Sequence, residues 1–394
     1  MGAVTVLITG VLPIRTAIDG ITANSSVNPL KILALFLSMT LISEFLDDAG
    51  FFDFLANRIF LKTKGGALKL FIVIYLAVSV LTVFTSNDII ILTFTPSICI
   101  FSKKARISPI PFLIGEFVAA NTWSMALIVG NPTNIYLAQS FGVSFFEYFK
   151  VMWLPTIAGG ITGLLVLLIL FYKPLREPIG ATLDDISASN IKIKKTPLIF
   201  AVAHLLVCLV MLAISDIIKV EMYLICLILL LSLTLFNGVY ALLKERSLKS
   251  VFTAYKKAPY ELIPFVLSMF IIVLALSHNG VTDALSSLLV TGGKADAISF
   301  GFLSAVSSNL LNNIPMSVLF EKIIGDSLPA LYGAVIGSNI GAFITPVGAL
   351  AGIMWNKILK SYGVKLSFIK FVLYGVTVAI PVLIASTLTL FLIV

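Results

Sequence analysis

Two carboxylates stand inside long apolar stretches of the sequence, where an ionised group is costly. Asp88 directly follows Ser86 and Asn87, and Glu116 lies in the next apolar stretch. A charged carboxylate at the centre of a membrane-spanning helix costs roughly 2.5–3.5 kcal/mol on insertion scales. Because acids in such positions commonly serve proton or ion coupling, Asp88 and Glu116 are the candidates for proton coupling. Alternatively, Asp88 caps a helix, and Glu116 pairs with a boundary lysine such as Lys103.

Amides, hydroxyls and glycines gather in two stretches, 86–134 and 307–352, and interrupt their apolar character. In hydrocarbon, freed backbone is tolerated only where it is buried in protein or lines a cavity. Half-helix N-termini favour anions and unwound carbonyls favour cations, although the same residue types also cap helices. We predict that the two stretches form halves of one substrate and ion site. With Asp88, its candidate residues are Ser86, Asn87, Asn121, Thr122, Gly130, Asn131, Asn134, Ser308, Asn309, Asn312, Asn313, Asn339, Thr345 and Gly348.

These two stretches repeat each other in order and spacing. The matched pairs are Ser86-Asn87 with Ser308-Asn309, Ala120-Asn121 with Ser338-Asn339, and Phe141-Gly142-Val143 with Tyr362-Gly363-Val364, at offsets of 222, 218 and 221 residues. Three matches in register indicate an internal duplication.

The elements that must position these residues are membrane helices. Of the 394 residues, 59% are hydrophobic and 12% are charged, which is typical of an integral membrane protein and not of a soluble domain. About 20 apolar residues span a bilayer as a helix, and residues 2–21 are the first candidate. We predict an all-α polytopic protein with transmembrane repeats at 1–172 and 197–394, a charged cytoplasmic linker at 173–196, and hairpin tips at 86–88 and 308–310.

Lysine and arginine are distributed unevenly between two sets of loops. With a re-entrant hairpin at each Ser-Asn pair, one set holds 19 of these residues and the other holds 3. The first set is 50–66, 102–107, 172–196, 244–258 and 357–366, and the second is 20–30, 142–147, 217–221, 280–296 and 321–328. Cytoplasmic loops carry the excess, which puts the N-terminus inside and the C-terminus outside the inner (plasma) membrane. The hairpins then open to opposite sides, as in an inverted-topology repeat with two broken helices.

Other chemistries find little support in the sequence. Cys99, Cys208 and Cys226 lie in apolar surroundings, where cysteine is more often core filler than a disulfide or metal ligand. His204 and His278 are too few for a metal cluster. No catalytic dyad is evident, so we expect neither an enzyme nor a cofactor. The net charge of +8 is explained by cytoplasmic loops and does not call for nucleic acid.

Several of these motifs resemble the arsenite efflux pumps of the ArsB type and the wider ion transporter superfamily. That superfamily also holds the NhaD-type sodium/proton antiporters, citrate transporters and divalent anion/sodium symporters. The resemblance covers about residues 32–371. It rests on Leu46-Asp47-Asp48-Ala49-Gly50-Phe51-Phe52, Ser86-Asn87-Asp88, Thr95-Pro96, Asn121-Thr122-Trp123-Ser124, Asn131-Pro132-Thr133-Asn134, Ser308 to Pro315, Gly337-Ser338-Asn339-Ile340-Gly341, Ile344-Thr345-Pro346, Leu350-Ala351 and Trp355.

The resemblance implies two re-entrant hairpins and two broken helices around a central site, with transport driven by an ion gradient. The sodium sites of the symporter branch fall by position on Ser86, Asn87, Gly130, Asn134, Ser308, Asn309 and Gly348. This chain departs from the family patterns at three positions. Asp88 and Leu310 replace the Thr of the symporters' Ser-Asn-Thr signature, and Asn121 stands where arsenite pumps often have an acid.

Taken together, these patterns predict a secondary transporter that exports arsenite or antimonite against proton entry by alternating access. The alternatives are sodium/proton exchange, sodium-coupled uptake of a carboxylate or inorganic anion, and, in a different class, a passive ion channel. The coupling ion is H⁺ or Na⁺. The expected partners are a small solute and the lipid bilayer, with a homodimer and, for an arsenite pump, an ATPase subunit as further predictions.

Overall fold

The computed structural model describes residues 2–22, 28–62, 66–177 and 193–394, and these residues contain helices and no strand. The first half comprises α1 (Gly2–Ile8), α2 (Ile14–Thr22), α3 (Pro29–Asp48), α4 (Phe51–Lys62), α5 (Gly66–Phe84), α6 (Asn87–Ala105), α7 (Ile110–Trp123), η1 (Ser124–Ala126), η2 (Ile128–Gly130), α8 (Pro132–Ser140), α9 (Phe145–Leu170) and η3 (Pro174–Arg176). The second half comprises α10 (Lys195–Ala213), α11 (Ser215–Ile218), α12 (Met222–Tyr240), η4 (Ala241–Glu245), α13 (Lys249–Lys257), α14 (Leu262–His278), α15 (Val281–Leu289), α16 (Asp296–Leu311), α17 (Asn313–Ile324), α18 (Leu328–Gly341), α19 (Leu350–Ser361) and α20 (Phe368–Ile393).

Seven helical stretches among the described residues are long and apolar enough to cross a membrane. They are Pro29–Asp48, Gly66–Phe84, Phe145–Leu170, Lys195–Ala213, Met222–Glu245, Lys249–His278 and Phe368–Ile393. Each is about 20 residues or longer, the length that spans the hydrocarbon core. The protein is therefore an all-helical, multi-pass membrane protein.

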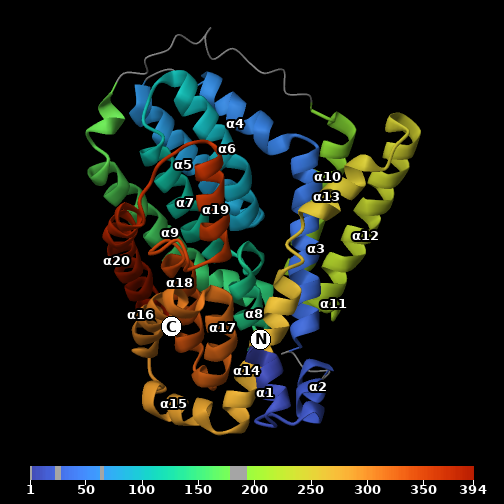
Figure 1. Cartoon of the computed structure of the whole chain (residues 1–394), viewed down its shortest axis with the longest axis vertical. Helices are drawn as coiled ribbons and strands as arrows, with labels where there is room; N and C mark the ends of the chain where they lie inside the picture. Colours follow the sequence, from blue (N-terminus) through green and yellow to red (C-terminus); the bar gives the residue numbers. More distant parts are fainter. Residues whose placement is uncertain (1, 23–27, 63–65, 178–192) are drawn as a thin grey trace.

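The two hairpins, α5–α6 and α16–α17, lie toward opposite ends of the molecule (Figure 1). Figure 1 shows α4 to α7 in the upper part and α15 to α18 in the lower part. The broken helices run in opposite directions, because α7 lies above α8 whereas α18 lies below α19 (Figure 1). The arrangement matches an inverted repeat, while the re-entrant depth of the helix pairs α5–α6 and α16–α17 stays a prediction.

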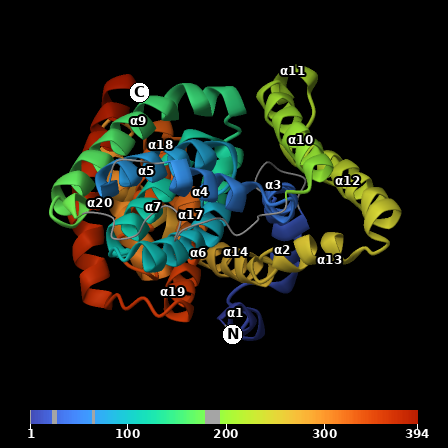
Figure 2. The same ribbon diagram turned by 90° about the horizontal axis from the view of Figure 1, so that it is seen from above.

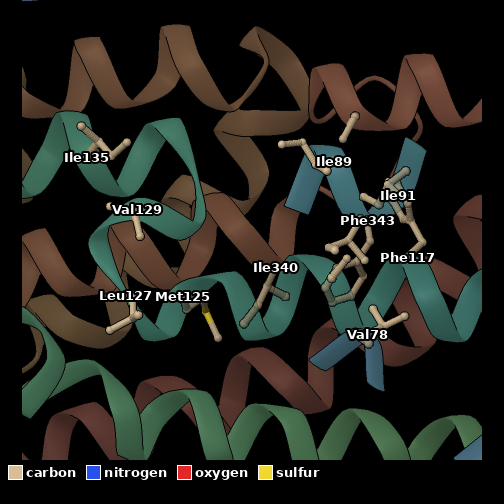
Figure 3. Close-up of a cluster of buried hydrophobic side chains, with 14 of the residues drawn as sticks. Val78, Ile89, Ile91, Phe117, Met125, Leu127, Val129, Ile135, Ile340 and Phe343 are labelled. Atoms are coloured by element: carbon tan, nitrogen blue, oxygen red, sulfur yellow. The ribbon is translucent and has the colours of Figure 1, made fainter. Parts of the chain in front are cut away.

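The halves also interleave. Helix α6 of the first half packs against α19 of the second, and α17 of the second half packs against α8 of the first. Figure 3 shows that Ile340 and Phe343 from the second half lie among Val78, Ile89 and Phe117 from the first half. A shared apolar core thus surrounds the breaks of both halves.

Local sequence explains where the first half breaks. Ser86 has an extended backbone between α5 and α6, within the predicted tip 86–88. Between α7 and α8, Asn131 caps α8 by accepting a hydrogen bond from Thr133 N, and Pro132 occupies the first turn. Asn is a favoured N-cap and Pro is tolerated at this first position, so the pair restarts a helix in mid-chain.

In the second half, the turn between the hairpin helices lies at Asn312, which has a φ of 78°. Asn is one of the few residue types that tolerates a positive φ. Ser308 and Asn309, in the predicted tip 308–310, instead lie in the last turn of α16. The repeated Ser-Asn pair therefore stands at the start of the second hairpin helix in one half and at the end of the first hairpin helix in the other.

Small residues hold α16 and α18 together. A Cβ at Gly337 would come within 1.9 Å of Ser304 Oγ and 2.0 Å of Gly301 O. A Cβ at Gly341 would lie 2.2 Å from Ser308 Oγ. Such small residues at a spacing of four let helix backbones approach closely inside a membrane, so this stripe fixes the second hairpin on its broken helix.

Helices from both halves also form a layer beside the interleaved hairpins and broken helices. Helices α10, α12 and α13 pack against α3, and Figure 2 shows α10 and α12 at the right, away from α5 and α20. Lys194 Nζ lies 3.1 Å from both Asp48 Oδ2 and Glu245 Oε1, which links α3, α10 and the end of α12. We refer to α3, α10, α12 and α13 as the flanking layer.

The expected first span, residues 2–21, is not one helix. It divides into α1 and α2, which both pack on α14 near the lower end of the molecule in Figure 1. Gly10 has a φ of 72°, and Pro13, which precedes α2, lacks the N–H that a continuous helix needs. Most of the predicted linker, residues 178–192, lies outside the described residues, and the side of the membrane on which each terminus lies stays a prediction.

Candidate substrate and ion site

At the start of α6, the first half presents polar groups that are only partly satisfied. Asn87 Nδ2 donates to Asn121 Oδ1 at 3.0 Å, and Asn121 Nδ2 donates to Phe117 O at 2.8 Å. Ser86 Oγ and Asn87 Oδ1 are buried and have no hydrogen-bond partner among the described residues, and the same holds for Thr122 Oγ1 on α7. Because an unpaired buried polar group costs about 1–3 kcal/mol, these oxygens are available for a bound ion or solute.

Asp88 lies in the first turn of α6 and is half-buried. The positive end of the helix dipole stabilises a carboxylate in this position. Ser86, the N-cap residue, makes no side-chain capping bond, so the capping role is open to Asp88. Its position beside the unpaired oxygens also suits the binding and release of a proton.

Glu116 is fully buried on α7 and faces a hydroxyl rather than a cation. Thr95 Oγ1 of α6 lies 2.9 Å and 3.0 Å from its two carboxylate oxygens. Among the described residues, no ion pair joins Glu116 to Lys103. Since a buried charge without a partner is expensive, Thr95 is the main polar contact that makes this position tolerable.

In the second half, Asn309 is the central residue. Its Nδ2 donates to Gly341 O at 2.9 Å and to Ala305 O at 2.8 Å. Its Oδ1 accepts a hydrogen bond of 2.6 Å from Thr345 Oγ1. Gly348 is close on the other side, since a Cβ there would lie 2.8 Å from Asn309 Oδ1. The end of α16 is thereby fixed to the break between α18 and α19.

The turn of the second hairpin is tied to the same break. Asn312 Nδ2 donates to Val347 O at 3.3 Å, and Asn313 N donates to Gly348 O at 3.0 Å. Asn313 Oδ1 is buried and has no partner among the described residues. It is therefore the second-half counterpart of the unpaired oxygens near Asn87.

Asn339 joins the two broken helices. Its Oδ1 accepts hydrogen bonds of 2.8 Å from both Ser124 Oγ and Asn131 Nδ2. Its Nδ2 donates to Asn134 Oδ1 at 2.8 Å. All of these side chains are at most 1% exposed, so Asn131, Asn134 and Asn339 are satisfied by one another. Their main role in this geometry is to hold the halves together.

Gly130 allows the chain to turn back on itself next to this network. A Cβ at Gly130 would lie 2.2 Å from Ser124 O, and Asn134 Nδ2 donates to the same carbonyl at 2.8 Å. Thr133 Oγ1 and Ser338 Oγ add a further contact of 3.1 Å between the halves. The predicted residues of the first break thus converge with Asn339.

The structure adds residues that the sequence patterns did not single out as site residues: Thr95, Ser124, Thr133 and Ser338. Ser124 stands three residues after Asn121, and Ser338 directly precedes Asn339, so their place in the same motifs was the available signal. The unpaired groups of the site are oxygens, which bind hard cations and accept hydrogen bonds from hydroxylated solutes.

Solved structures and sequence relatives indicate the class of protein. The fold is similar to the crystal structure of the Alcanivorax borkumensis YdaH transporter, with a TM-score of 0.62 and 13% sequence identity, over 96% of this chain and 87% of that one. The arsenical pump membrane protein of Yersinia enterocolitica is 28% identical, over 89% of this chain and 83% of that protein. The arsenical pump membrane protein of Escherichia coli K12 is 27% identical, over 97% of this chain and 90% of that protein.

A family model covers most of the chain. The model described as CitMHS, citrate transporter, matches residues 1–332. Its match includes the whole first half, the flanking layer and the second hairpin. Helical spans, an inverted arrangement of broken helices and transporter relatives agree with this match. The protein is a secondary transporter that belongs to the CitMHS citrate transporter family.

Proposed function

We propose that this transporter exports arsenite or antimonite in exchange for protons. Two sequence relatives that match nearly the whole chain are arsenical pump membrane proteins. The observation that carries the proposal is the placement of Asp88 at the start of α6, directly after Ser86 and Asn87, whose side-chain oxygens are buried and unpaired. An acid next to unused ligand atoms combines a proton carrier with a solute site in one place.

The chemistry of the solute suits these atoms. Arsenous acid is uncharged near neutral pH and carries three hydroxyl groups, which both donate and accept hydrogen bonds. The unpaired oxygens at Ser86, Asn87 and Thr122 can accept from those hydroxyls. No Lys or Arg is among the candidate site residues, which fits an uncharged solute better than a dianion.

In this proposal, Asp88 carries the coupled proton. In the outward-facing state Asp88 binds a proton from outside, and in the inward-facing state it releases that proton to the cytoplasm. The metalloid leaves in the opposite direction by alternating access. Glu116 provides a second protonatable position on α7, in contact with Thr95.

Sodium-coupled transport of a carboxylate is the second candidate. The family to which the chain belongs is described as citrate transporters. Asn309, Thr345 and Gly348 lie together at the second break, beside the carbonyl of Gly341. Such a group of oxygens suits Na⁺, and the same positions are those of the symporters' sodium sites by resemblance.

Transport by purified protein in liposomes with an imposed pH gradient and a trapped pH dye tests the proposal. Arsenite, sodium, citrate and sulfate are added in turn. Asp88→Asn is the test variant, and Asp216→Asn, at an exposed acid on α11, is the matched control. We expect arsenite-dependent proton flux in the wild type and in Asp216→Asn, and its loss in Asp88→Asn.

Other outcomes of the liposome assay would support a different function. Proton flux with sodium alone would assign sodium/proton exchange, and flux that persists in Asp88→Asn would reduce Asp88 to a helix cap. Citrate uptake driven by sodium, without proton movement, would support the second candidate. Passive arsenite flux that no gradient drives uphill would indicate a channel.

A further inference from the structure

Three sulfur atoms meet inside the flanking layer, away from the candidate site. Cys208 Sγ on α10 lies 3.7 Å from Cys226 Sγ on α12 and 3.6 Å from Met39 Sδ on α3. Both cysteines are 0% exposed and Met39 is 4% exposed. The cysteines are free thiols, and Cys99, the remaining cysteine of the chain, belongs to α6.

The spacing of the two thiols restricts what could bridge them. Two sulfurs bound to one atom through bonds of about 2.3 Å, the length of a zinc–thiolate bond, lie roughly 3.3–3.8 Å apart for bond angles of about 90–110°. A linear two-coordinate ion would separate them by about 4.6 Å. The observed 3.7 Å therefore fits a pyramidal or tetrahedral centre, and not a linear one.

The number of available ligands further restricts which atom could bridge the two thiols. No group of three or more His, Cys, Asp or Glu side chains that could hold a metal ion occurs among the described residues. A structural zinc ion takes four such ligands. A centre that needs only two thiolates, with a neighbouring thioether, must be soft and thiophilic. Trivalent arsenic meets both conditions, because it is pyramidal and binds paired thiols.

We propose that Cys208 and Cys226 form a binding site for trivalent arsenicals, separate from the transport site. In the reaction with an arsine oxide, two S–H bonds break and two As–S bonds form. The oxide oxygen takes both protons and leaves as water, and arsenic stays trivalent. The product carries no net charge, which suits its apolar surroundings. The bridge joins α10 to α12 next to Met39 of α3.

A lipid-soluble arsenical can reach the pair from the bilayer. Figure 2 shows α10 and α12 at the edge of the molecule. Their outer faces expose large apolar side chains, which a membrane would cover: Ile199, Leu206, Val210, Ile228, Leu231 and Leu235. The two thiols therefore lie on the outermost helices, α10 and α12, which a membrane would contact directly.

The test uses phenylarsine oxide and the purified full-length protein in detergent, in the presence of an excess of a monothiol. Intact-protein mass spectrometry counts the bound phenylarsenic groups. We expect one group per chain, with the loss of two hydrogens, and its removal by a small dithiol. Cys99→Ser, a matched control at a lone buried cysteine, keeps the adduct, whereas Cys208→Ser and Cys226→Ser each lose it.

Two results would overturn the site: no adduct on the wild type in detergent or in lipid nanodiscs, or an adduct that remains in both Cys208→Ser and Cys226→Ser. Thermal unfolding of each variant shows that the fold is retained, and the use of two variants guards against one that fails to fold. Because the readout is a mass, it does not depend on arsenite transport. A negative transport assay would not contradict the Cys208–Cys226 site, and a negative mass measurement would not contradict the proposed arsenite transport.

Discussion

The two halves share a topology, yet polar groups are used differently in each. In the first half, Asn87 makes one amide contact with Asn121, and the oxygens of Ser86 and Asn87 stay unpaired. In the second half, Asn309 uses its amide nitrogen twice and its oxygen once within the protein. The first half is thus open to a ligand, whereas the second half is largely satisfied by itself.

The two halves also differ in how the first helix of each hairpin packs on its broken helix. Helices α16 and α18 approach through a stripe of Gly and Ser, where a Cβ at Gly337 would strike backbone atoms. Helices α5 and α7 meet instead through Phe71, whose ring would lie 2.5 Å from a Cβ at Gly115. Both acids proposed for coupling, Asp88 and Glu116, belong to the half that packs through a large side chain. The hairpin that carries Asp88 therefore packs less closely on its broken helix than the hairpin of the second half does.

The strongest test of this difference compares one added methyl group in each half. Gly337→Ala meets Gly301 O and Ala305 N, which cannot move without shifting α16, so we expect it to lose more than about 3 kcal/mol of stability. The atoms nearest to the new methyl group of Gly115→Ala belong to the ring of Phe71, and we expect a loss of about 1–3 kcal/mol. Thermal unfolding in detergent measures both. Equal losses would show that the two interfaces are alike.

The amide network gives a smaller expected difference. Asn339→Ala removes the partner of Ser124, Asn131 and Asn134, and we expect a loss of about 2–3 kcal/mol. Asn121→Ala leaves Asn87 Nδ2 without its partner and removes one hydrogen bond to Phe117 O within the same helix, so we expect about 1 kcal/mol. Denaturation in a urea series would compare them. A larger loss for Asn121→Ala would place the main junction in the first half.

The smallest expected effects come from two threonines. Thr95→Val removes the hydroxyl that contacts Glu116 in a fully buried position, and we expect a loss of about 1–2 kcal/mol. Thr345→Val removes a hydrogen bond to Asn309 that is only partly buried, so about 0.5–1 kcal/mol is expected. Thermal unfolding measures both losses. A larger loss for Thr345→Val than for Thr95→Val would contradict the argument that the contact with Glu116 is the more deeply buried one.

Local breaks could be predicted from the sequence, because they depend on neighbouring residues. Asn131 and Pro132 restart α8, and Ser86 marks the first turn. The turn at Asn312 lies beyond the repeated Ser308-Asn309 pair, since a repeated motif does not reveal which backbone will adopt a positive φ. The split between α1 and α2 at Gly10 was not predicted, although Pro13 and Arg15 already interrupt the apolar stretch 2–21.

Contacts between distant residues could not be predicted in the same way. All eight asparagines of the predicted site are candidates for ligand binding, and the sequence alone does not separate ligands from structural contacts. Asn339 lies more than 200 positions from Asn131 and Asn134, yet satisfies both. Only the meeting of two broken helices assigns these amides to each other and leaves Asn87 and Asn313 with unpaired oxygens.

The interleaving of the halves has a mechanical consequence. Helix α6 packs on α19, α17 packs on α8, and Asn339 bonds across the breaks. A rotation of one repeat against the other would break the α6–α19 contact, the α17–α8 contact and the buried hydrogen bonds of Asn339 together. The surfaces between the interleaved halves and the flanking layer contain no such network of amides in the described residues. Alternating access, as predicted from the sequence, would therefore cost the least free energy if the hairpins and broken helices of both halves moved together as one rigid unit relative to the flanking layer.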